Sequence, residues 1–111
     1  MISICNIKVV EFDMAFYLVR AKPRKELLEN LQEELNSGKI SKMRPFGHAL
    51  QYSLENARMD TQTHGEYAIW VEEDYSSPPP LAMERESVLD RYFSDISVQK
   101  VESEEVWHGI A

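Results

Sequence analysis

The chain has 111 residues and a formal net charge of −7, with 43% apolar residues, 28% charged residues and a single cysteine. This length suits one globular core, so we expect a single domain over residues 1–111. The acidic balance argues against nucleic acid as a partner, because a protein that binds phosphate backbones carries a basic face. The lone Cys5 cannot form an internal disulfide, which excludes the disulfide frameworks of small secreted proteins.

The N-terminal residues do not have the pattern of a signal peptide. Asn6 and Lys8 interrupt the apolar run, and no small-residue cleavage site follows it. No stretch of the sequence approaches the roughly 20 apolar residues of a membrane-spanning helix. We therefore expect a soluble, cytoplasmic protein that does not have a membrane as a partner.

Residues 2–21 are rich in Ile, Val, Phe and Tyr and contain neither Gly nor Pro, which predicts a strand. A straight strand of that length would far exceed the usual length of roughly five to six residues. We therefore expect a bulge or bend near Glu11 to Asp13, where carboxylates interrupt the apolar run. Residues 14–19 are apolar on both faces, which favours a central strand.

Two helical patterns follow this strand. In the first, Pro23 suits the opening turn, and leucines recur at helical spacing until Gly38, which is placed for a left-handed C-terminal cap. The second pattern follows a loop at residues 39–45, where Pro45 suits its first turn, and it ends near Arg58. The composition of residues 60–65 predicts a loop.

A second strand is predicted over residues 66–74, where apolar side chains alternate between the two faces. Three prolines at 78–80 form a short stiff spacer before a third helical pattern, at residues 81–93. A third strand of weaker alternation is predicted over residues 96–101. The tail from residue 102 onward carries no clear pattern.

The order strand, helix, helix, strand, helix, strand predicts a two-layer α/β (α+β) sandwich, with a small sheet covered by helices on one face. This layering loosely resembles that of ferredoxin-like folds. The sequence is one clear strand short of that pattern unless the N-terminal segment splits in two. A likeness at the level of layers carries no function.

One face of the predicted sheet would be left open. We expect the helices to cover the face that carries Phe16, Leu18, Ile69 and Val71. The opposite face would then expose a contiguous apolar patch, of a size that is rare on monomers. This patch consists of Tyr17, Val19, Ala68 and Trp70.

A second copy of the chain is the expected cover, because most soluble oligomers are symmetric and use self-complementary patches. The alternative is the C-terminal tail, whose Val106, Trp107 and Ile110 could fold back over the patch. The leading functional hypothesis is therefore a small homodimeric module that self-associates through a sheet face and has no catalytic activity of its own.

The second hypothesis, from a different class, is a small-molecule enzyme or sensor that binds an anionic metabolite near residues 39–48. Lys39, Lys42 and Arg44 precede the second helix, whose N-terminal N–H groups and dipole favour a phosphate or carboxylate. Surface lysines and arginines are more often solvated, and the glycine spacing of a phosphate-binding loop is missing.

His48, Tyr52 and Glu55 share one face of the second helix by their spacing and are the candidate catalytic residues. The carboxylate could orient the imidazole, and the hydroxyl could donate to a developing oxyanion. We prefer the interpretation of an exposed helix shoulder, because such a group must also lie in a cleft to work. The sequence leaves open whether the protein is an enzyme.

Acidic residues end the second strand, where Glu72, Glu73 and Asp74 could hold a hard divalent cation. Alternation sends Glu73 to the opposite side from the other two, so we interpret all three as solvated charges. Glu84 belongs to an acidic set that we interpret as the solvated face of the third helix. We expect no metal site and no cofactor, because the sequence lacks the His and Cys pairs of zinc sites.

Overall fold

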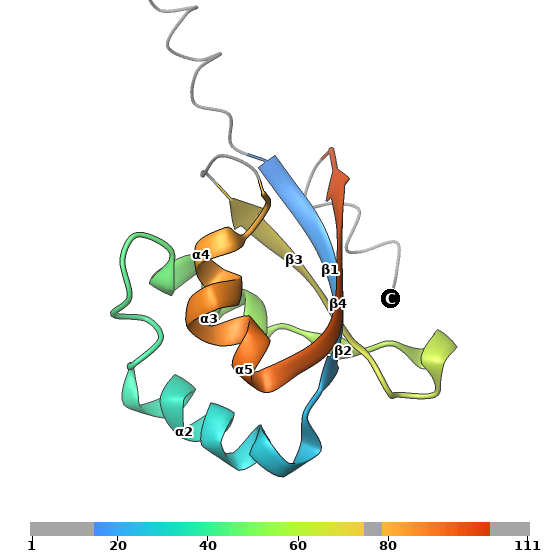
Figure 1. Cartoon of the computed structure of the whole chain (residues 1–111), viewed down its shortest axis with the longest axis horizontal. Coiled ribbons are helices and arrows are strands. Elements are labelled where there is room, and N and C mark those ends of the chain that lie inside the picture. Colours follow the sequence, from blue (N-terminus) through green and yellow to red (C-terminus); the bar gives the residue numbers. More distant parts are fainter. Residues whose placement is uncertain (1–14, 75–78, 103–111) are drawn as a thin grey trace, which may run out of the picture.

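The computed structural model describes residues 15–74 and 79–102. Its central feature is a four-stranded antiparallel sheet with the order β2-β3-β1-β4 (Figure 1). β1 (Ala15–Pro23) lies between β3 (Ala68–Asp74) and β4 (Phe93–Val101), and β2 (Arg58–Met59) pairs with the start of β3. The prediction that the first strand is central is confirmed.

Helical segments make the longer connections between strands. The connection from β1 to β2 contains a 3₁₀ turn at Lys25–Leu27, then α2 (Leu28–Ser37) and α3 (Gly47–Glu55). The connection from β3 to β4 contains α4 (Ala82–Glu84), a π-helical turn at Arg85–Leu89 and α5 (Asp90–Tyr92), which follow one another directly. A 3₁₀ turn at Thr61–Thr63 lies between β2 and β3.

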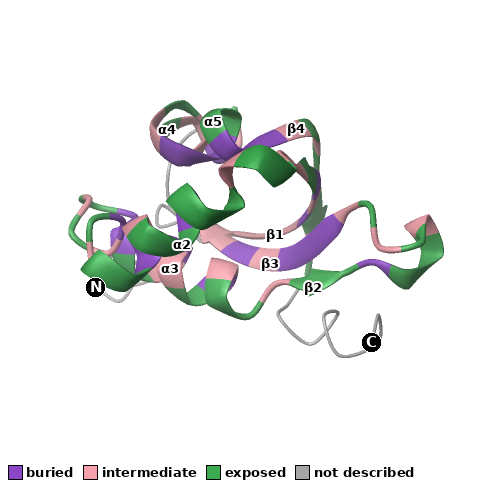
Figure 2. Ribbon diagram, turned by 90° about the horizontal axis from the view of Figure 1, so that it is seen from below, coloured by how far each residue is buried: buried purple, intermediate pink, exposed green. Residues whose placement is uncertain are grey.

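This arrangement confirms the predicted two-layer α/β sandwich (Figures 1 and 2). The sequence pattern was one strand short, and the missing strand is β2. With β2, the strands and helical connections follow the β-α-β-β-α-β order of ferredoxin-like folds. The helical pattern of the sequence predicted instead a helix that ends near Arg58. A strand of two residues has no alternation to detect, and only its pairing with β3 defines it.

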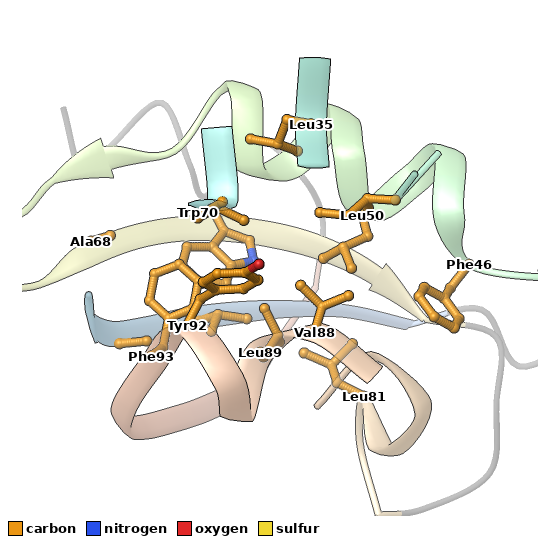
Figure 3. Close-up of a cluster of buried hydrophobic side chains, with 14 residues drawn as sticks. Leu35, Phe46, Leu50, Ala68, Trp70, Leu81, Val88, Leu89, Tyr92 and Phe93 are labelled. Carbon is orange, nitrogen blue, oxygen red and sulfur yellow. The ribbon is translucent and has the colours of Figure 1, made fainter. Parts of the chain in front are cut away.

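The predicted assignment of the two sheet faces is wrong. The helices pack on the face that carries Tyr17, Val19, Ala68 and Trp70, and the last three side chains are at most 6% exposed. Figure 3 shows Trp70 inside this cluster beside Phe93, with 5.2 Å between the ring centroids. These residues form the core, so they cannot be the predicted interface. Both faces of these strands are apolar, and alternation alone did not show which one the helices would cover.

The opposite face of the sheet, which we call the outer face, carries the residues that were expected to be covered. Phe16 and Leu18 on β1 lie beside Glu73 and Val71 on β3, and Val101 of β4 lies on the other side of Phe16. All five side chains are half-buried. The buried helical residues of the core cluster, among them leucines of α2 and α3, pack with Val19 and Trp70 rather than with these side chains.

Several element boundaries differ from the prediction. Pro23 is the last residue of β1, paired with Phe93, and not the start of a helix. Gly38 has φ of 82° and ends α2 in the left-handed conformation, as predicted. α3 is shorter at both ends than the predicted helix. A register shift in β1 lies between Arg20 and Lys22, whereas the predicted bulge near residues 11–13 and the predicted tail contact lie outside the described residues.

In the part of the chain that the structure describes, no helix combines the length and the apolar character needed to cross a membrane.

Candidate functional site

The predicted anion site lies in the loop before α3, and its three basic side chains are exposed. Two of them contact different groups of the protein. Lys39 Nζ lies 3.7 Å from Glu34 Oε2, and Arg44 Nη1 donates to the carbonyl oxygen of Ser41 over 3.0 Å. Lys42, the third predicted ligand, is likewise an exposed loop residue. Within the described residues, Lys39 lines a hollow at the end of α2 that does not include Lys42 or Arg44.

Backbone carbonyl groups occupy the start of α3. The Gly47 N–H donates to the carbonyl oxygen of Met43 over 2.8 Å. A Cβ atom at Gly47 would lie 2.4 Å from the carbonyl oxygen of Ile40 and 2.6 Å from that of Ser41, so the loop presses directly on the helix. The Gly47 N–H at the start of α3 is therefore bonded to the backbone of the preceding loop and is not available to an anion.

Two of the three candidate catalytic residues lie together. His48 and Tyr52 line a hollow of about 420 Å³ between α3 and the edge of β3, and the Tyr52 side chain is 62% exposed. Glu55 is not among the residues that line it, and its Oε2 accepts a hydrogen bond from Gln51 Nε2 over 2.9 Å. Glu73 lies in this hollow instead. The exposed positions agree with the helix-shoulder interpretation.

Three buried carboxyl groups form a cluster that the sequence interpretation missed. Glu72, Asp74 and Glu84 are 0%, 4% and 2% exposed. Glu72 and Asp74 point to the helix-covered face of β3, as alternation predicts, and Glu84 comes from α4. The prediction that these acids are solvated is therefore wrong. We call them the carboxyl cluster.

The carboxyl cluster is only partly satisfied by hydrogen bonds. Trp70 Nε1 donates to Glu72 Oε1 over 3.1 Å, and the Leu81 N–H donates to Asp74 Oδ2 over 2.9 Å. Glu72 Oε2 and Glu84 Oε1 are buried and have no hydrogen-bond partner in the described part of the chain. A buried polar atom without a partner costs about 1–3 kcal/mol, and more when it is charged.

Burial is the main reason that the pKa of Glu72 is raised to about 9, and the negative charge of Glu84 contributes to the rise. The hydrogen bond from Trp70 acts in the opposite direction. Glu72 is therefore protonated at neutral pH. Burial also raises the pKa of Glu84, a hydrogen bond from its own backbone lowers it, and the charge of Asp74 raises it.

The sequence did contain a signal for the burial of Glu84. Leu81, Glu84 and Val88 follow the spacing of one helical face, and both apolar members are fully buried. The side chain between them on that face was therefore placed to enter the core. Acidic residues are almost never fully buried, so the sequence favoured a solvated Glu84 in spite of this spacing.

A cavity of about 350 Å³ adjoins the carboxyl cluster. Asp74 and Glu84 line it together with Glu73. The rest of its wall is apolar and comes from α4 and from the residues at the start of α3: Pro45, Phe46, Ala49 and Met83. The cavity thus combines carboxyl groups with an apolar wall.

The outer face carries charges of opposite sign at its two ends. Glu73 lies beside Phe16 at one end. Arg20 and Arg58 flank Ile69 at the other end, and Ile69 is 1% exposed there. Arg20 Nε lies 2.9 Å from Asp60 Oδ2, which fixes the position of its guanidinium group. The apolar side chains lie between these ends.

Within the described residues, no group of three or more His, Cys, Asp or Glu side chains is arranged to hold a metal ion. Comparison of the chain with protein-family models, with curated proteins and with solved structures finds no match. The cavity and the outer face are therefore interpreted from their own geometry.

Proposed function

We propose that the protein is a module that self-associates by packing the outer faces of two copies against each other. The observation that carries the proposal is the set of half-buried apolar side chains on that face, Phe16, Leu18, Val71 and Val101. The proposal retains the cytoplasmic homodimer expected from the sequence and moves its interface to the opposite face of the sheet. Burial of this apolar surface supplies the driving force for association.

The distribution of charge favours a second copy of the chain as the partner. In a two-fold pair whose strands run antiparallel across the interface, the Glu73 end of one copy lies opposite the Arg20 end of the other. The apolar centres around Leu18 then face each other. Opposite charges at the two ends of one surface, with Arg20 also paired to Asp60, favour an identical partner.

Sedimentation velocity of the full chain tests this proposal. We expect the wild-type protein to sediment as a dimer, and Leu18→Glu, which places a charge at the centre of the outer face, to sediment as a folded monomer. Leu28→Glu is the matched control, because Leu28 is an exposed leucine on α2, and α2 packs on the opposite face of the sheet. Far-UV circular dichroism checks that each variant is folded.

Val71→Glu provides a second variant in case Leu18→Glu does not fold, since Val71 neighbours Leu18 on the same face. A wild-type chain that stays monomeric at high concentration contradicts the proposal. So does a folded outer-face variant that keeps the dimer mass.

A further inference from the structure

The cavity beside α4 shares Glu73, but none of the apolar residues, with the outer face, and it has two kinds of wall. Phe46 and Met83 belong to its apolar side, whereas Asp74 and Glu84 are acidic residues of its wall. Both carboxyl groups are almost completely buried, at 4% and 2% exposed. The negative charge of Asp74 opposes ionisation of Glu84, so the two acidic groups repel each other.

The unpartnered oxygen of Glu84 is the observation that points to a ligand. The buried Oε1 has no hydrogen-bond partner among the described residues, and Glu84 is one of the residues that line the cavity. Asp74 differs, because the Leu81 N–H already fixes its Oδ2. If the Glu84 side chain turns toward the cavity, a cationic donor there gives Oε1 its missing hydrogen bond and offsets the negative charge of Glu84. A buried carboxylate oxygen without a partner is costly, and a bound cation would lower that cost.

We infer that this cavity is a binding site for an organic cation, an ammonium or guanidinium group carried on an apolar body. The apolar part would pack against Met83 and against the ring of Phe46, which also attracts a cation placed over its face. The volume of about 350 Å³ falls in the range of small-molecule pockets, about 300–1,000 Å³.

A bare divalent metal ion fits this site less well than an organic cation. Calcium takes six to eight oxygen ligands and magnesium keeps several waters, as rough rules. The described residues offer no group of three or more acidic, His or Cys side chains with metal-site geometry. The apolar wall would leave the hydration shell of a metal ion without partners, whereas it suits a hydrocarbon chain.

The same cationic group could belong to a free amine or to a Lys or Arg side chain of a peptide. Both sources present a positively charged donor at the end of an apolar stem, so the cavity chemistry is shared. The experiment below separates them by comparing a small amine with a short lysine peptide.

The test is a ¹⁵N chemical-shift titration of the full chain. The probes are n-butylammonium, n-butylguanidinium and a blocked lysine tripeptide, and 1-butanol and the acetyl-lysine form of the tripeptide are the uncharged controls. We expect saturable shifts at the amides of Ala49, Met83 and Glu84 with at least one cation and none with its uncharged control. Tighter binding of the tripeptide than of butylammonium assigns the site to peptides, and the reverse assigns it to free amines.

Glu84→Gln keeps the side-chain volume and removes the charge, so we expect it to weaken binding by about tenfold or more. Glu86→Gln is the control, because Glu86 is an exposed acid two residues along the same helical segment. The inference is overturned if no cation gives saturable shifts, if 1-butanol gives the same shifts, or if Glu84→Gln binds as tightly as Glu86→Gln. If Glu84→Gln does not fold, the contrast between butylammonium and 1-butanol on the wild-type chain decides the question.

This inference does not depend on self-association. The titration reports on the amides around the cavity, and Leu18→Glu should give the same shifts as the wild-type chain. A monomeric chain that binds the cation would contradict only the proposed self-association. A dimer that binds no cation would contradict only this inference.

Discussion

Two charged regions of this protein behave in opposite ways. The basic loop before α3 carries Lys39, Lys42 and Arg44 on exposed stems, and its tightly packed part is the backbone. At the end of β3 the opposite holds, because the carboxyl groups of Glu72 and Asp74 are buried. The density of basic residues along the sequence predicted a site at the loop, whereas the groups with raised pKa values, Glu72 and Glu84, lie at the strand end and on α4.

This difference shows that burial determines how strongly a charged group interacts with its surroundings and whether its pKa is shifted. An exposed charge is screened by water and salt and interacts weakly with its neighbours. A buried carboxyl group changes its pKa, as that of Glu72 is raised to about 9, and needs a partner for each oxygen. In the basic loop the packing of the backbone determines stability, whereas in the carboxyl cluster the buried side chains do. Substitutions in the two regions should therefore have different effects.

The largest effect is expected from Gly47→Ala. The new Cβ would lie 2.4 Å from the carbonyl oxygen of Ile40, so the loop and α3 must move apart. We expect the free energy of unfolding, measured by urea denaturation, to fall by about 3 kcal/mol. Gly65→Ala is the comparison, because open space surrounds Gly65 and only its φ of 78° opposes a side chain. That change should cost about 1 kcal/mol. Equal losses for the two variants would refute the close contact.

Glu72→Gln should stabilise the protein. The folded pKa of Glu72, about 9, lies above its ordinary value of 4.5, so between these values the folded state holds a proton that the unfolded state has lost. The stability from this group is therefore fully present below about pH 4.5 and is lost as pH rises toward about 9, with a slope of up to about 1.4 kcal/mol per pH unit. Glu72→Gln removes this slope, and the amide oxygen can still accept from Trp70.

Urea denaturation at about pH 5 and about pH 8 measures this effect. We expect Glu72→Gln to raise the free energy of unfolding by about 2 kcal/mol at the higher pH and by less at the lower one. The exposed Glu86 provides the control, because Glu86→Gln should leave the pH dependence unchanged. A destabilised Glu72→Gln protein at the higher pH would mean that the carboxylate has a partner that offsets its burial.

The smallest effect is expected from Lys42→Ala and Arg44→Ala. Both side chains are exposed, and the hydrogen bonds of Arg44 reach only carbonyl oxygens of its own loop, so each change should alter the free energy of unfolding by no more than about 0.5 kcal/mol. Inorganic phosphate should leave the melting temperature unchanged. A rise with phosphate that disappears in Lys42→Ala would restore the anion-binding hypothesis and reverse the contrast between the two regions.

Local patterns accounted for much of the fold. Helical spacing of leucines and the glycine at position 38 indicated α2 and its end, and apolar content on both faces indicated that β1 is central. Alternation correctly separated Glu73 from Glu72 and Asp74. These features depend on neighbours within one element, so a window of the sequence contains their cause.

The candidate sites were harder to predict, because they depend on contacts between elements. His48 and Tyr52 were correctly placed on one helical face, yet the hollow they line contains Glu73 from the sheet and not Glu55 from the same helix. The cavity beside α4 joins residues from the start of α3, the end of β3 and α4. Nothing in their sequence separation indicates that these segments meet.

The sequence by itself determined which side chains share a face of each strand and helix, because the periods of 2 and 3.6 residues are properties of the backbone. Only the tertiary structure decided which face of the sheet the helices cover, since Trp70 and Val71 point to opposite faces and both are apolar. It also decided that Glu84 is buried, because that depends on α4 packing over the end of β3. Water around a carboxyl group is excluded by segments distant in the chain, so the change in the chemistry of Glu72 arises only when those segments assemble.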